Sequence, residues 1–190
     1  MCLHTKRTRL TADHDIKCYK VLQSFEGLQY EVSTNEIIKW QGKGFEYLTP
    51  YNYFPMKIDT TYTDDNRPCV GSADECGIKD ISRGFFHTFS HIEHALDAIG
   101  DCEMYGAIVV ECVIPKGTNY YEGSMSYDDA QNGNITSYAS KTLKLTHIIV
   151  AKTDNPKKDT ILTLRYNGKV YEKYGYDQNH FANYWEEVKK

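Results

Sequence analysis

Three histidines form the densest group of titratable side chains in the sequence: His87, His91 and His94. Spacings of three and four residues can place imidazoles on one face of a helix, where they can bind a metal ion. However, His87 precedes the expected start of that helix, and the His-Glu-x-x-His order of a zinc protease is absent. We therefore interpret all three as solvated histidines near a helix start, and we predict no metal site.

The chain has 6 cysteines, which are the next candidates for chemistry. Cys69 and Cys76 stand further apart than the cysteines of a zinc knuckle, so they do not predict a metal site. Cys18 and Cys112 lie in apolar runs typical of strands and are expected to be small core residues. No apolar signal segment follows Met1, so we expect a cytoplasmic protein with free thiols.

Motifs for several other chemistries are absent from the sequence. It contains no Gly-x-Ser-x-Gly elbow, no dinucleotide-binding glycine fingerprint and no phosphate loop with Gly-Lys-Ser/Thr. We therefore expect no bound cofactor and no redox or nucleotide-triphosphatase activity. The net charge of -4 argues against general electrostatic binding of nucleic acid. The longest apolar run, 107–110, is far shorter than a membrane span of about 20 residues, so we expect no membrane contact.

Aromatic residues make up 13% of the chain, and 16 of them are tyrosines. Aromatic faces can stack on a base or another flat ring. The segments 47–53 and 120–121 are therefore candidate ligand contacts, although packing at the edge of a core explains such tyrosines more simply. The same composition favours pleated, half-buried strands.

The elements that must position these residues are expected to be mostly strands. Alternation of apolar and polar residues predicts strands over 16–22, 28–32 and 143–151, and apolar residues on both faces of 107–114 predict a strand that is partly buried on both sides. The dipeptide Asn167-Gly168 predicts a hairpin between 161–166 and 169–174. Residues 59–80 lack periodicity and are expected to form a long loop, and 118–134 is a second loop candidate.

Two helices are expected. Ser90 and Glu93 have the spacing of a capping box, so a helix is predicted to begin at Ser90 and to end at Gly100. Asp177 is expected to cap a closing helix. Its apolar stripe consists of Phe181, Tyr184, Trp185 and Val188.

These elements together predict an α+β fold. We expect a mostly antiparallel, twisted sheet with one packed helix, followed by a C-terminal hairpin and helix. The expected domain is 1–151, with 152–190 as an appendage. Because the stripe on the closing helix must cover apolar surface, a homodimer through that helix is a further expectation.

The order of several short segments resembles a family of short uncharacterised proteins of gut bacteria and their phages. The segments are Met1-Cys2-Leu3, Cys18-Tyr19-Lys20, Gly84-Phe85-Phe86-His87 and Ile114-Pro115-Lys116-Gly117. The resemblance covers about residues 1–151. It implies an origin in a phage or a mobile element, but it implies no activity.

A second, weaker resemblance is to ADP-ribosyltransferases. In those enzymes a first strand supplies Arg or His, where this chain has Tyr19 and Lys20. The segment 87–90 is loosely similar to their middle element, and Glu122 is the carboxylate nearest the late position. This resemblance makes His87 and Glu122 the catalytic candidates and NAD the implied cofactor.

We expect a non-catalytic cytoplasmic protein that binds a small ligand or a host protein. The candidate ligand-binding residues are Tyr19, Lys20, Tyr51, His87, Tyr120 and Tyr121. Two alternatives stay open at this point: an ADP-ribosyltransferase-like enzyme that uses NAD, and a counter-defence protein that captures nucleotides.

Overall fold

The structure is a computed structural model, and it divides the chain into two compact units. It describes residues 2–24, 43–44, 47–50, 54–101, 107–152, 162–166, 169–173 and 186–187. The first unit consists of 1–20, 59–95 and 111–146, and the second consists of 21–58, 96–110 and 147–190. Four of the five boundaries fall within helix α2 and within the three strands β3 (Ile16–Ser24), β10 (Ala107–Ile114) and β13 (Thr142–Lys152), and the fifth falls between residues 58 and 59.

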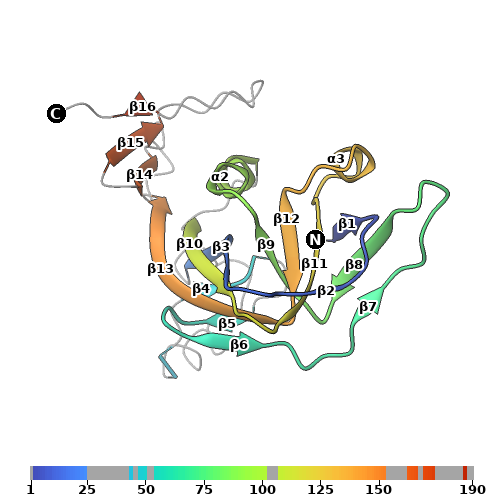
Figure 1. Cartoon of the computed structure of the whole chain (residues 1–190). Helices are drawn as coiled ribbons and strands as arrows, with labels where there is room; N and C mark the ends of the chain where they lie inside the picture. Colours follow the sequence, from blue (N-terminus) through green and yellow to red (C-terminus); the bar gives the residue numbers. More distant parts are fainter. Residues whose placement is uncertain are drawn as a thin grey trace. The chain divides into compact units, whose positions relative to one another are not determined.

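The main sheet of the first unit contains four antiparallel pairings (Figure 1). Its order is β3, β9 (Phe86–Phe89), β12 (Ser137–Ser140), β11 (Asn119–Gly123) and β2 (Leu10–Thr11). Strands place successive side chains on opposite faces, so neighbouring residues of β9, β11 and β12 lie on different faces of this sheet. The stretch 118–123, expected as part of a loop, therefore contains strand β11.

A second, three-stranded sheet packs on one face of the first. It consists of β1 (Leu3–Thr5), β8 (Lys79–Arg83) and β7 (Cys69–Val70). Its Leu3 and Ile81 are fully buried and form a core cluster with Phe85, Tyr121 and Ala139. Removing these apolar groups from water is the main stabilising contribution of the contact.

The two sheets approach closely at Gly123. The backbone of His4 exchanges two hydrogen bonds with that of Ser124, at 2.8 and 3.0 Å. A Cβ atom at Gly123 would lie 2.2 Å from the carbonyl oxygen of His4. Only glycine fits here, because any side chain would force the two backbones apart.

The segment expected to be a long loop contains two short strands and the start of β8. The strands are β6 (Thr61–Thr63), which pairs with β13, and β7. The Asp74 carboxylate accepts backbone hydrogen bonds from Cys76 and Ile78, at 2.9 and 2.8 Å. Polar turns of this kind do not produce a periodic pattern of hydrophobic residues. The sequence pattern therefore did not predict that the segment 59–80 is ordered.

Helix α2 (Ile92–Asp101) begins two residues later than predicted. Ser90 does not form the expected capping box, because its N–H is still bonded to the sheet at Thr136 and its hydroxyl donates to the Ile135 carbonyl. The helix does bury Ile92 and Leu96, as expected. It includes Gly100, which was expected to end it.

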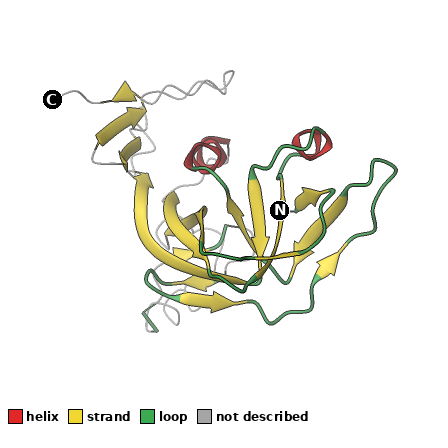
Figure 2. Ribbon diagram, viewed as in Figure 1, coloured by secondary structure: helices red, strands yellow, loops and turns green. Residues whose placement is uncertain are grey.

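A helix that the sequence analysis did not predict, α3 (Tyr127–Gln131), follows β11 (Figure 2). It has a true cap, because the hydroxyl of Ser126 accepts a hydrogen bond from the N–H of Asp129. The phenol of Tyr127 donates to Asp74. The helix is thereby tied to the segment that leads into β8.

The described strands of the second unit form antiparallel pairs. Gln23 in β3 lies opposite Leu48 in β4 (Tyr47–Leu48), which pairs with β5 (Pro55–Met56). The predicted hairpin is confirmed in its two strands, and β13 precedes them in the sheet. The two strands are β14 (Leu162–Tyr166) and β15 (Lys169–Lys173), and the short β16 (Glu186–Glu187) pairs with β15.

Several predictions fall outside the described residues. These are the strand over 28–32, the turn at Asn167-Gly168 and most of the closing helix, including its proposed cap Asp177 and its stripe. Glu186 and Glu187 form strand β16, so that part of the predicted closing helix was wrong. Elsewhere the structure is mostly antiparallel sheet, as expected for the predicted class. Neither helix found in the described part of the chain is long and apolar enough to cross a bilayer.

Candidate functional site

The main sheet of the first unit has two faces with different chemistry. Tyr19 pairs with Phe89, and Tyr121 pairs with Ala139, which in turn pairs with His87. Because directly opposed residues share a face, these residues define what we call the Tyr121 face. Their sequence neighbours point the other way. They define the Lys20 face, which carries Cys18, Lys20, Thr88, Tyr120, Glu122, Tyr138 and Ser140.

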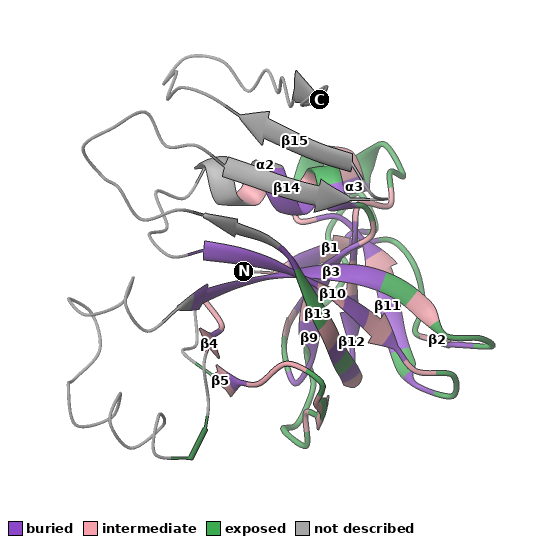
Figure 3. Ribbon diagram, turned by 90° about the vertical axis from the view of Figure 1, so that its left-hand side faces the viewer, coloured by how far each residue is buried: buried purple, intermediate pink, exposed green. Residues whose placement is uncertain are grey.

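Lys20 is the most unusual residue of the Lys20 face. Its side chain is buried, with the residue 7% exposed, and its amine donates a hydrogen bond to the backbone oxygen of His87 at 2.9 Å. Burial lowers the pKa of this amine, because desolvation disfavours the charged form. Figure 3 shows most of β3 as buried. In the ranges that the structure describes, no carboxylate forms an ion pair with Lys20.

Two buried thiols flank this amine. Burial raises the pKa of the Cys18 thiol to about 12, against the smaller opposite effect of the neighbouring Thr88 hydroxyl. Burial also raises the pKa of Cys112 well above its ordinary value, and the nearby Cys18 adds to this effect. Both side chains are therefore neutral thiols at physiological pH and supply no negative charge to Lys20.

Ser140 is a second buried polar group on the Lys20 face. It lies between Phe86 of β9 and Tyr120 of β11 in the antiparallel register. The residue is fully buried, and its hydroxyl has no hydrogen-bond partner within the described residues. A buried hydroxyl without a partner lowers the free energy of unfolding, so such groups are rare in native proteins.

The β11 side of the same face carries a carboxylate that is already bound. Glu122 Oε2 accepts from the Arg7 guanidinium at 2.6 Å, and Oε1 accepts from the Tyr120 phenol at 3.4 Å. The rings of Tyr120 and Tyr138 meet edge to face at 6.0 Å. Burial raises the pKa of both phenols, and Glu122 contributes in the same direction.

The Tyr121 face also holds a buried polar atom without a partner among the residues described. His87 Nε2 is buried and has no hydrogen-bond partner in the described part of the chain. Burial lowers the pKa of His87 to about 3, and the nearby Lys20 adds to this effect. The imidazole is therefore neutral. The prediction of a solvated histidine was wrong for His87, because this residue lies within β9 and its Nε2 is buried.

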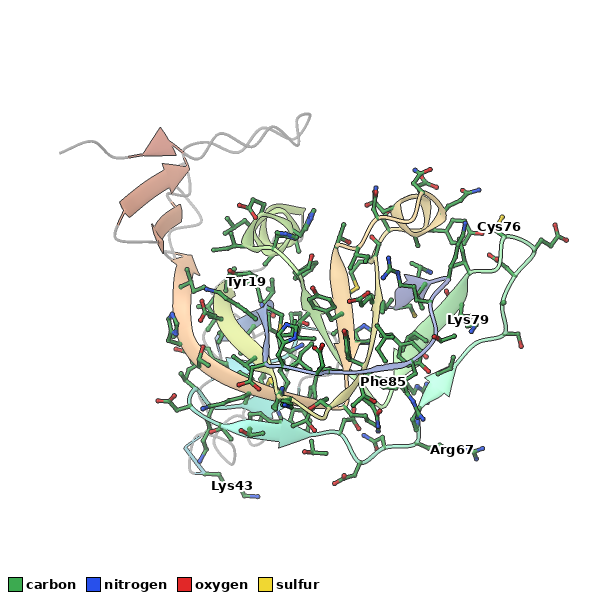
Figure 4. All side chains as sticks on the ribbon, viewed as in Figure 1. Tyr19, Lys43, Arg67, Cys76, Lys79 and Phe85 are labelled. Carbon is green, nitrogen blue, oxygen red and sulfur yellow. The ribbon has the colours of Figure 1, made fainter. Side chains whose placement is uncertain are left out.

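The remaining aromatic candidates of this face pack as structural residues. Tyr121 meets Phe85 edge to face at 5.4 Å within the cluster that the second sheet covers. The Lys17 amine lies 5.7 Å from the centre of the Tyr19 ring, and Lys17 also forms an ion pair with Glu111. Figure 4 labels Tyr19 and Phe85 among the side chains of the first unit.

The candidate residues from the sequence therefore separate into two groups. Lys20, Tyr120 and Glu122 lie on the Lys20 face, whereas Tyr19, His87 and Tyr121 lie on the opposite face. Tyr51 lies outside the described residues.

Sequence reasoning missed three side chains of the candidate site: Arg7, Tyr138 and Ser140. The residues Ser-Tyr-Ala-Ser of 137–140 carry no pattern that shows the burial of Ser140. The partners of Arg7 and Tyr138 depend on strand pairings over long sequence distances, which no local pattern reports.

The other groups with metal-binding potential do not converge. His91 and His94 stack edge to face at 5.9 Å, without His87. Cys69 and Cys76 are exposed, and no disulfide joins any of the five cysteines in the described residues. Across these same residues, no group of three or more His, Cys, Asp or Glu side chains has an arrangement that can hold a metal ion.

Comparison with known proteins gives no relative for this chain: no family model, no curated protein and no solved structure matches it. The functional argument therefore depends on the geometry of the two faces. His87 and Glu122, the two catalytic candidates, lie on opposite sides of the sheet. They cannot act on the same substrate atom, because acid–base catalysis requires hydrogen-bond reach to the reacting group.

Proposed function

We propose that this chain is a non-catalytic binding protein that holds a small ligand on the Lys20 face. One observation carries the proposal: buried polar groups gather on that face while the two catalytic candidates separate across the sheet. Binding sites for small molecules combine apolar and aromatic walls with a few polar groups that fix the orientation of the ligand. The Lys20 face has this combination in Tyr120, Tyr138, Lys20 and Ser140.

The state of Glu122 also favours binding over catalysis. Its two oxygens are already occupied by Arg7 and Tyr120. A carboxylate that must stabilise positive charge in a transition state is more effective when it is free to face the substrate. The pair of Arg7 and Glu122 instead offers a neutral, polar edge to the face.

The alternatives from the sequence stay predictions. A transferase that uses NAD needs an Arg or His near its carboxylate to fix the cofactor, and here Arg7 is bound to Glu122 itself. A nucleotide-capturing protein would be one special case of the proposed binding function. The resemblance to proteins of gut bacteria and phages names no ligand.

The first test is nicotinamide release from NAD by the intact protein. We expect no release above the buffer rate for the wild type, for Glu122→Gln or for the matched variant Glu93→Gln on the exposed surface of α2. Release that falls by orders of magnitude in Glu122→Gln, but not in Glu93→Gln, would refute the non-catalytic proposal and favour the transferase.

The second test measures binding directly. Melting temperatures are recorded with a panel of nucleoside monophosphates, sugar phosphates, small carboxylic acids and neutral nucleosides. We expect at least one compound to raise the melting temperature of the wild type and to have a smaller effect on Tyr138→Ala, because binding to the folded state stabilises it. If no compound shifts the wild type, the proposed binding function fails.

A further inference from the structure

We propose that Lys20 anchors an anionic group of the ligand, a carboxylate or a phosphate, on the Lys20 face. This inference rests on the proposed function and names the chemical class of its ligand. It depends on the position of Lys20, on the groups around it and on the buried hydroxyl of Ser140.

The Lys20 amine has more N–H donors than its one hydrogen bond within the described residues requires. A lysine ammonium carries three N–H donors, and here one of them is used, by the backbone oxygen of His87. A buried charge is normally paired with an opposite charge, because desolvation without such a pair is costly. Among the described residues no carboxylate pairs with this amine.

The titratable groups near Lys20 do not supply the missing charge. They are the thiols of Cys18 and Cys112 and the imidazole of His87, which interact electrostatically with the amine. Burial keeps both thiols protonated and keeps the imidazole neutral. An anion from solution would therefore be the group that completes the pair.

Ser140 is the independent observation that points to a ligand. Its hydroxyl is buried, lacks a partner within the described residues and belongs to the same face as Lys20. Lys20 comes from β3 and Ser140 from β12, so the two donors lie on either side of β9. Carboxylate and phosphate oxygens accept several hydrogen bonds at once, which suits donors from the two strands that flank β9.

A purely structural role for Lys20 predicts the opposite behaviour on mutation. If the amine stabilised the fold, its removal would lower the melting temperature. A buried amine without a counter-charge instead lowers stability, and replacement by an apolar side chain of similar length removes that penalty. We therefore expect Lys20→Met to melt at a higher temperature than the wild type in the absence of an anion.

The experiment compares sodium phosphate and sodium acetate with sodium chloride at constant ionic strength. Calorimetric titrations and melting curves are recorded for the wild type, Lys20→Met, Ser140→Ala and the matched control Lys144→Met, whose lysine is exposed. We expect at least one anion to bind the wild type and Lys144→Met. The affinity of Lys20→Met should be about 10- to 100-fold lower, as for loss of a hydrogen bond to a charged group, and that of Ser140→Ala should be reduced less.

Proton uptake by the wild type provides a readout that needs no variant. Because burial lowers the Lys20 pKa, a bound anion should restore the charged amine and take up a proton at alkaline pH. Titrations in buffers of different ionisation enthalpy measure this uptake. Binding of phosphate but not of acetate, or of acetate but not of phosphate, identifies the anionic group of the ligand.

The possible failures are distinct. The inference is overturned if Lys20→Met binds both anions as the wild type does, if neither anion binds the wild type, or if binding takes up no proton. A neutral nucleoside that binds the wild type and Lys20→Met equally would leave the binding function intact and refute the anionic anchor. A failure of the whole compound panel would refute the binding function itself.

Discussion

The same strands of the first unit present two faces with opposite properties. The Tyr121 face is closed by the second sheet, and its cluster is apolar except for the phenol of Tyr121. The Lys20 face buries an amine without a counter-charge and a hydroxyl without a partner among the described residues. The comparison indicates that one face stabilises the fold, whereas the other retains groups that reduce stability and serve binding.

The largest expected effect tests the closed face. Ile81→Ala should lower the free energy of unfolding by about 2 to 5 kcal/mol, because it removes a fully buried side chain and leaves a cavity. Urea titration measures the loss. The control is Ile148→Ala, whose side chain is exposed and should contribute little. A loss from Ile81→Ala as small as that from the control would mean that the second sheet does not close the Tyr121 face.

The next effect concerns His87, the polar exception on the closed face. Its pKa is about 3 in the folded protein, whereas an unfolded histidine has an ordinary value of 6.5. Above pH 6.5 the imidazole is neutral in both states and contributes no pH dependence. Below pH 6.5 the unfolded chain binds a proton at His87, whereas the folded chain does not. The free energy of unfolding should therefore fall by up to about 1.4 kcal/mol per pH unit between pH 6.5 and 3.

Urea titrations of His87→Phe at pH 7, 6, 5 and 4 isolate this contribution. The variant should lose less stability on acidification than the wild type, since it has no group to protonate. The matched control is His91→Phe, which makes the same substitution at an exposed histidine. Equal slopes for the wild type and His87→Phe would show that the imidazole is solvated, as the sequence alone had suggested.

The smallest effect tests how the second sheet is held against the first. Ser126→Ala removes the cap of α3 and should lower the free energy of unfolding by about 1 kcal/mol. Ser90→Ala should cost less, because its hydroxyl caps no helix, although it bonds to the Ile135 carbonyl at 3.3 Å and to His91 Nδ1 at 2.8 Å. Thermal melts of the two variants distinguish them. A larger loss of stability for Ser90→Ala than for Ser126→Ala would indicate that Ser90 forms the capping box.

Local sequence patterns predicted the elements that carry their own periodicity. The strand over 107–114 is confirmed residue for residue, because it is a nearly continuous apolar run and both of its sides are largely buried. The hairpin strands and the existence of α2 are confirmed for similar reasons. The second sheet was missed, because Leu3–Thr5 and Lys79–Arg83 are short and pair across more than 70 residues.

The candidate site was only partly predictable for a related reason. Lys20 and Tyr120 were among the expected ligand contacts. No local pattern predicts that these two residues share a face of the sheet. Nor does one predict that Tyr19, His87 and Tyr121 share the opposite face. That division follows from the registers of β9, β11 and β12, which are set by tertiary packing. Burial of Ser140 likewise depends on what covers the strand and not on its neighbours in sequence.

The bridge between His4 and Ser124 has a consequence for synthesis on the ribosome. The two residues are separated by 120 positions, and β1 also waits for its partner β8. At about 5 to 20 residues per second, translation needs about 6 to 24 s to cover that interval. Until the end of that interval Leu3, and Ile81 once it is made, lack strand β11 with its Tyr121. The yield of folded protein in a cell should therefore depend on chaperones that shield the nascent chain.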